Sequence, residues 1–175
     1  MPPGGTTGSL PEIAEALPAV TKSVDALESE MLPLLEEDGP PQVLREADAE
    51  VVRIERKLIG WLDLLKGRAN SFDRNLSDLR SRKELWELTR DQADAADLPV
   101  ALVNQVDETL RAIERVELII RDRRSEILTV QAGAAEQRSR LRTLADQLQS
   151  EIQERQEHLL RLDSPTLWKA FGQPR

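Results

Sequence analysis

Residues 44–86 read LREADAEVVRIERKLIGWLDLLKGRANSFDRNLSDLRSRKELW, and this stretch decides the fold. Within it an apolar residue recurs at every seventh position: Leu44, Val51, Leu58, Leu65, Phe72, Leu79 and Trp86. A seven-residue apolar repeat is typical of helices that pack along a narrow supercoiled seam. No proline occurs between Pro41 and Pro99. The stretch therefore predicts one helix of roughly 55 residues, about 80 Å long at the α-helical rise.

A second row with the same spacing lies further along the chain: Val106, Ile113, Ile120, Ile127, Ala134, Leu141 and Leu148. The next proline is Pro165, so this helix can run for about 60 residues. Only the short segment 95–99, which reads AADLP, separates the two rows. Two long helices joined by a short link fold back on each other, so we expect an antiparallel pair with its tip near residue 98.

A shorter helix is predicted before these two. Its apolar residues follow in steps of three and four, which is the helical period: Leu10, Ile13, Leu17, Val20, Val24, Leu27 and Met31. Ser9 can cap its start, and Pro18 and Pro33 should kink or end it. The run Asp38–Pro41 is a firm break, after which this first helix should lie against residues 42–68.

The predicted fold class is all-α: an elongated antiparallel coiled-coil hairpin of two long helices, with a shorter N-terminal helix that makes a three-helix base. The predicted helices span about 9–37, 41–96 and 98–162 of a helical domain that covers 9–163. Residues 1–8, rich in Pro, Gly and Thr, are predicted to be disordered. Residues 164–175 are predicted to form a short C-terminal segment, in which Ser164 and Pro165 start a new helix.

Composition disfavours several classes of function. The chain has a net charge of −8, and its first fifty residues are strongly acidic, which disfavours nucleic-acid binding. It contains no cysteine, and His158 is its only histidine, so neither a thiolate nor a zinc site is expected. It has no run of about 18 apolar residues, so no segment is expected to span a membrane.

Catalysis is not expected either. The chain lacks phosphate-binding glycine loops and nucleophile motifs, and its carboxylates read as placed on solvated helix faces. Glu117 with Arg121 and Glu151 with Arg155 have the spacing of ion pairs along one helix. We therefore predict no catalytic residue, no cofactor, no metal and no small-molecule substrate.

Charged residues interrupt the second row's seam at Arg123 and Arg124. In an antiparallel pair with its tip near 98 these arginines lie opposite Asp73. We predict an ion pair there that fixes the register, as polar seam positions do in other coiled coils.

The three tryptophans have different contexts. Trp61 and Trp86 fall on or beside an apolar row and are expected to pack. Trp168 follows the end of the predicted third helix and lies near Leu167 and Phe171. Two interpretations stay open for Leu167, Trp168 and Phe171. They pack on the base of the bundle, or they contact a membrane–water interface, where tryptophan is enriched.

Three stretches resemble one family of membrane proteins. They are WELTR at 86–90 with DLP at 97–99, RDRRSEILTVQ at 121–131, and RLDSPTLW at 161–168. Over residues 80–170 the chain is similar to the long N-terminal extramembrane regions of large members of the small-conductance mechanosensitive channel family. The run ending at Trp168 resembles the stretch that precedes the first membrane helix of such proteins.

The resemblance implies a periplasmic helical domain on the outer side of the bacterial inner membrane, with a structural or tension-transmitting role. Its implied partners are other subunits or the transmembrane part of a channel, and envelope components. The alternative is a free-standing, cytoplasmic coiled-coil scaffold or adaptor that mediates protein–protein contacts. An antiparallel hairpin satisfies its own seam, so a monomeric domain is compatible with either.

Overall fold

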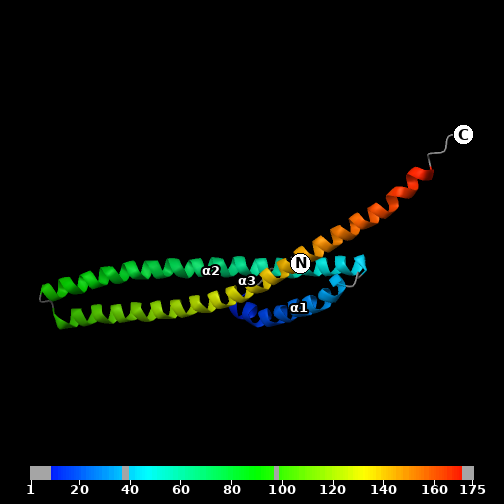
Figure 1. Ribbon diagram of the computed structural model, residues 1–175. Coiled ribbons are helices and arrows are strands. Elements are labelled where there is room, and N and C mark those ends of the chain that lie inside the picture. The colour runs from blue at the N-terminus through cyan, green and yellow to red at the C-terminus, as the bar shows by residue number, and fades with distance from the viewer. Residues whose placement is uncertain (1–8, 37–39, 97–98, 171–175) are drawn as a thin grey trace, which may run out of the picture. The chain divides into compact units, whose positions relative to one another are not determined.

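The computed structural model describes residues 9–36, 40–96 and 99–170, with side chains up to Arg155 in the last of these ranges. The described residues are all-helical and form three helices, α1 (Leu10–Glu36), α2 (Pro41–Ala95) and α3 (Val100–Ala170) (Figure 1). The helices pack as a helical bundle, so the predicted all-α class is confirmed. The predicted disorder of residues 1–8 lies outside the described residues.

Capping residues account for the helix starts. The Ser9 hydroxyl accepts a hydrogen bond from the backbone N–H of Glu12 at 3.4 Å, and the Ser9 N–H donates to the Glu12 carboxylate at 2.8 Å. This reciprocal pair is a capping box, and it confirms Ser9 as the cap of α1. Pro41 occupies the first turn of α2, where its missing N–H costs nothing.

Two of the helices continue through prolines inside them. α1 contains both Pro18 and Pro33. α3 does not end at residue 162 but continues through Pro165 to Ala170, so the predicted helix end and the separate helix from Ser164 are wrong. A proline removes one backbone donor from the ladder and strains one turn, which a long run of good helix formers can tolerate.

The chain divides into two compact units. Unit 1 comprises Met1–Ile13 and Trp61–Gly133, and unit 2 comprises Ala14–Gly60 and Ala134–Arg175. Each unit has its own buried core.

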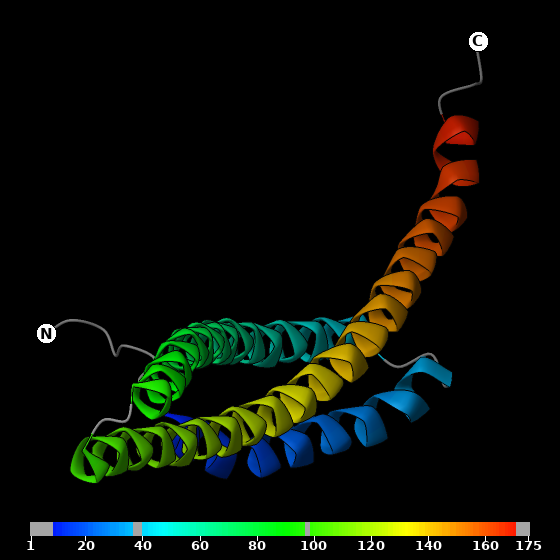
Figure 2. The ribbon, with the colours of Figure 1, turned by 90° about the vertical axis from the view of Figure 1, so that its left-hand side faces the viewer.

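In unit 1, α2 and α3 lie side by side and run in opposite directions (Figures 1 and 2). Asp73 pairs with Arg124 at 2.6 Å, and Lys83 pairs with Glu114 at 2.7 Å. Asp73 and Lys83 are as far apart on α2 as Arg124 and Glu114 are on α3, so one antiparallel register holds over both pairs. The buried apolar residues come from both helices: Leu65, Ala69, Leu76, Val106, Leu110 and Ile127.

In unit 2, all three helices contribute to the core. Its buried apolar residues include Val20, Val24, Leu27 and Met31 of α1, Leu44, Val51, Ile54 and Leu58 of α2, and Leu141, Leu144 and Leu148 of α3. Each fully buried leucine stabilises the fold by about 1.5–3 kcal/mol. Arg140 of α3 joins α1 to this core, since its guanidinium donates to Glu28 at 3.1 Å and to Asp25 at 2.7 Å.

Candidate functional site

An apolar groove lies at the far end of unit 1, between the last turns of α2 and the first turns of α3. Its volume is about 530 Å³. The lining residues are all uncharged: Trp86, Thr89, Gln92, Ala93, Ala96, Leu102, Gln105, Val106 and Thr109. Among the described residues of its wall none is ionisable, so the groove offers a surface for apolar and neutral polar contacts.

Side-chain size explains the hollow. Ala93 and Val106 are buried and form its floor, whereas Trp86 and Leu102 stand at its edges. Ala93 near the end of α2 and Ala96 just after it are both small, so they leave space that larger side chains would fill. Trp86 was expected to pack on or beside the apolar row, and it is partly exposed where it lines the groove.

Other exposed apolar side chains lie in the same end of unit 1. They are Leu85, Leu88, Val100 and Leu102. Single exposed apolar residues are ordinary on protein surfaces, but apolar residues gathered around a groove mark contact sites.

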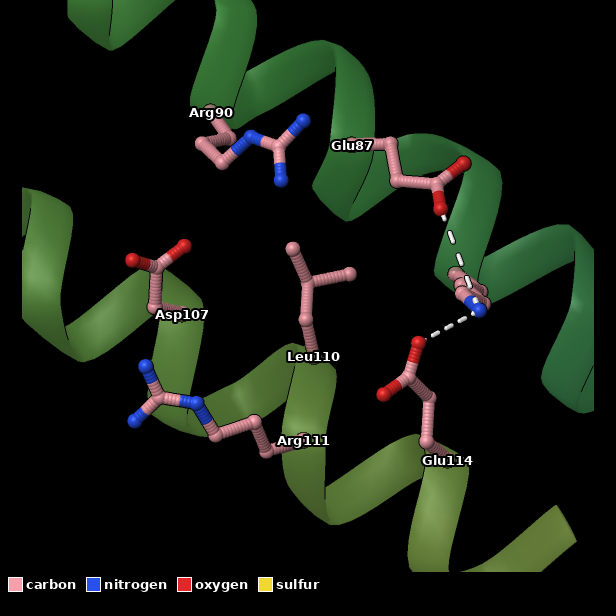
Figure 3. A pocket seen from close by; sticks show the side chains of 7 residues that line it. Glu87, Arg90, Asp107, Leu110, Arg111 and Glu114 are labelled. Carbon is pink, nitrogen blue, oxygen red and sulfur yellow. Dashed lines mark hydrogen bonds and ion pairs between the residues drawn. The ribbon is translucent and has the colours of Figure 1, made fainter.

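A charged hollow of about 310 Å³ also lies between α2 and α3 (Figure 3). Lys83, Glu87, Arg90, Asp107, Leu110, Arg111 and Glu114 line it, so basic and acidic groups are balanced. In Figure 3, Leu110 points into the gap between the helices, and Arg90 of α2 and Asp107 of α3 point into the same gap.

Lys83 makes two ion pairs in the charged hollow. Its ammonium lies 2.7 Å from Glu114 and 4.0 Å from Glu87. The hydrogen bond from Lys83 lowers the pKa of Glu114, and the same bond raises the pKa of Lys83. These opposite charges satisfy one another, so the hollow has little net attraction for a charged ligand.

The structure places the predicted register residues as follows. Arg124 contacts Asp73 across the two helices, with Nε 2.6 Å from Oδ1. Arg123 pairs with Glu126 on its own helix at 3.0 Å and does not share this contact. The role of the Asp73–Arg124 pair in setting register stays a prediction.

Sequence reasoning missed a buried carboxylate in unit 1. Glu117 is only 6% exposed, so the expectation that every carboxylate lies on a solvated face is wrong. One oxygen accepts from Arg121 at 3.0 Å, as the spacing predicted, and the other, Oε1, is buried with no hydrogen-bond partner. Leu110, Glu117 and Arg124 follow one another at intervals of seven residues. This spacing is the sequence signal that could have placed Glu117 on the buried side of α3.

The remaining predicted contact residues have side chains that the structure does not describe. Leu167 and Trp168 are within α3, but their side chains, like those of His158 and Phe171, are not among the described ones. No group of three or more acidic, histidine or cysteine side chains in the described ranges could hold a metal ion. No helix in the described part of the chain has the length and apolar content needed to cross a bilayer.

Comparison with known proteins gives no relative: no family model, no curated protein and no solved structure matches the chain.

Proposed function

We propose that this chain is a non-catalytic helical domain that acts by binding another polypeptide along the apolar groove of unit 1. The observation that carries this proposal is the groove itself, whose wall of nine residues contains no charged side chain. Helix surfaces that face only water carry charged residues, so an uncharged, hollowed surface with an exposed tryptophan favours a contact site.

The scaffold for this site is, in our proposal, an antiparallel coiled-coil hairpin standing on a three-helix base. The two seven-residue rows support the hairpin, as does the constant register of the Asp73–Arg124 and Lys83–Glu114 pairs. The mixed core of unit 2, to which all three helices contribute, supports the base.

A non-catalytic role agrees with the chemistry of the groove. Thr89, Gln92, Gln105 and Thr109 are its polar groups, and none of them titrates near neutral pH. General acid–base chemistry needs a group that exchanges protons in that range. The polar groups of the groove are suited to hydrogen bonds with a bound chain instead.

Site-specific photo-crosslinking in living cells tests the contact. A photoreactive phenylalanine analogue replaces Leu102, which lines the groove, or Leu118, which is similarly exposed on the same helix. We expect crosslinked protein adducts from position 102 and few from position 118. Equal adducts from both positions, or none from 102, would contradict a contact through the groove.

A second candidate function is the extramembrane domain of a mechanosensitive channel on the periplasmic side of the bacterial inner membrane. It rests on the resemblance described above, whose most distinctive part is the run Ser164–Trp168. In that case the partners are the transmembrane part and other subunits of the channel, and the contact face serves the extramembrane assembly.

The parent reading frame decides this second candidate. We expect it to continue beyond Arg175 into apolar segments of about 20 residues, long enough to span a bilayer. A stop codon directly after Arg175 would remove the channel candidate and leave a free-standing scaffold.

A further inference from the structure

The boundary between the two compact units crosses each of the three described helices once. It falls after Ile13 in α1, after Gly60 in α2 and after Gly133 in α3. Few contacts cross the boundary between two compact units, so the helix backbones carry more of the connection there than inside a unit. The stiffness of the three helical turns at this boundary therefore decides whether unit 1 can bend relative to unit 2.

In α1 a proline weakens the turn that follows the boundary. This turn spans residues 14–18, and α1 stays helical through it. A carbonyl in an α-helix accepts a hydrogen bond from the N–H four residues later. Pro18 has no N–H, so the carbonyl of Ala14 lacks its usual partner and the helix kinks more easily there. Pro18 is exposed, so packing gives no reason for a proline at this position.

In α2 the last residue before the boundary is a glycine inside a long helix. Glycine has the freest backbone of all residues, so it weakens a helix interior relative to alanine. A helix can require such a glycine where a neighbour leaves no room for a Cβ atom. At Gly60 nothing beyond the helix's own nearby backbone lies within 4 Å of the position that a Cβ would take. Alanine would fit at this exposed position, so packing does not account for the glycine.

In α3 the last residue before the boundary is again a glycine. Gly133 lies between Ala132 and Ala134, in the interior of a helix of 71 residues. Of the three glycines within the described helices, Gly60 and Gly133 are at the boundary and Gly67 is not. Each helix thus has a residue that weakens helical structure at the boundary or within about one turn of it.

We propose that this boundary is a hinge, at which unit 1 bends relative to unit 2 while each unit keeps its own core. A freer backbone or a missing hydrogen bond lets a helical turn absorb the change in angle that a hinge needs. All three helices must be weakened, because one stiff helix across the boundary would resist the bending of the other two. The hinge does not involve the apolar groove, so it holds or fails independently of the proposed function.

A lanthanide tag on one unit tests the hinge in the purified full chain by nuclear magnetic resonance. The chain has no cysteine, so Ala49→Cys, at an exposed position of unit 2, gives a single attachment site. The tag aligns unit 2 in the magnetic field, and residual dipolar couplings of backbone N–H groups report the degree of alignment of each unit. Two units in one rigid body have equal degrees of alignment. We expect a smaller degree for unit 1, because bending averages its couplings.

Gly60→Ala in the tagged chain should raise the alignment of unit 1 toward that of unit 2, because alanine stiffens the turn at the boundary. Gly67→Ala is the matched control. It removes another exposed glycine of α2 with the same open space around it, but one that lies inside unit 1. Both substitutions should raise the melting temperature alike, and only Gly60→Ala should change the alignment.

Pro18→Ala is a second route to the same result, since it restores the N–H that the carbonyl of Ala14 needs. It should also raise the alignment of unit 1, and combining it with Gly60→Ala should raise the alignment further. Equal alignment of both units in the tagged chain without these substitutions would overturn the hinge. A Gly67→Ala variant that raises the alignment of unit 1 as much as Gly60→Ala does would overturn it as well.

Discussion

Arg140 concentrates the charge pairing of unit 2 in a single side chain. Its guanidinium contacts Asp25 and Glu28 of α1 and also donates to Gln137 at 3.1 Å. The hydrogen bonds that Arg140 donates to Glu28 and Asp25 raise its pKa further above its usual range, so it stays charged. One arginine with two carboxylates from another helix holds α1 against α3 more firmly than a pair within one turn.

Replacing Arg140 with methionine should lower the free energy of unfolding by more than replacing Arg53 does. The side chain is about a third exposed, so solvent screens part of its interaction, but Asp25 and Glu28 would be left facing each other. Urea denaturation measures the change. Arg53→Met is the control, since Arg53 is exposed and pairs with Glu50 within one turn; an equal loss in both variants would contradict a special role for Arg140.

The Lys83–Glu114 pair predicts a pH dependence. The pKa of Glu114 is lowered from 4.5 in the folded state, so its contribution is present above that value and is lost as pH falls through the folded pKa. Glu114→Gln should therefore lower the melting temperature at neutral pH, and the difference from the natural chain should fade as the pH falls through the lowered pKa of Glu114.

Lys83 has the opposite sign. Its pKa is raised from 10.5, so its contribution is present at neutral pH and is lost only as pH rises through the folded pKa. Glu108→Gln, the same substitution earlier on α3, is the control. Its melting temperature is measured in acid and in alkali, as for Glu114→Gln. A Glu114→Gln deficit that stays constant from neutral pH into acid would count against the ion pair.

At the scale of elements, the sequence predicted the helices well but predicted few of the contacts between side chains of different helices. The rows ending at Trp86 and Leu148 identified α2 and α3, because apolar spacing alone marks the seam. The end of α3 at Ala170 was missed because a proline rule is only a tendency. The Arg140 contacts were missed since sequence spacing gives the face of a helix but not which neighbour lies beyond it.

The groove shows the same limit in the candidate site. Leu102 and Val116 share a spacing with Leu144, which was visible in the sequence. Whether a third helix covers that line depends on where α1 begins and what it packs against, and this is a property of packing. Trp86 was therefore placed on the correct row, but its partial exposure at the groove was not predicted.

An engineered disulfide tests the register between α2 and α3. The chain has no cysteine, so a double substitution Leu76→Cys with Ile120→Cys provides the only thiols. The register given by Asp73–Arg124 places Leu76 opposite position 121, so Ile120 is within one residue of it and we expect the two Cα atoms to be close enough for a disulfide. Mild oxidation should close it, as a shift on a denaturing, non-reducing gel.

The control shifts one position by a full repeat. Leu76→Cys with Ile113→Cys moves the second thiol by about 10 Å along the helix, beyond disulfide reach. Faster closure of this control pair than of the 76–120 pair would show that the helices pair in another register.

At the scale of the whole molecule, stability comes from two buried cores of different kinds. Unit 2 buries side chains from three helices, and Leu58 and Leu141 are fully buried there. Unit 1 also buries the carboxylate of Glu117, whose Oε1 has no hydrogen-bond partner. A buried polar atom without a partner costs stability, so this position lowers the stability of unit 1.

Leu141→Ala should therefore be severely destabilising, by about 2–5 kcal/mol, because it opens a cavity among three helices. Leu128→Ala on the same helix is the control, since Leu128 is exposed and its truncation leaves no cavity. Thermal unfolding followed by circular dichroism measures both. Similar losses in the two variants would mean that position 141 is not enclosed in solution.

The charged hollow and the uncharged groove of unit 1 should respond differently to the kind of salt in solution. Sodium chloride screens exposed ion pairs such as Lys83–Glu114, so it should loosen the charged hollow and leave the uncharged groove almost untouched. Ammonium sulfate, which is excluded from protein surfaces, strengthens apolar burial instead and should favour occupation of the groove. The ionic composition of the surrounding medium can thus set how firmly the groove is closed without any change in the chain.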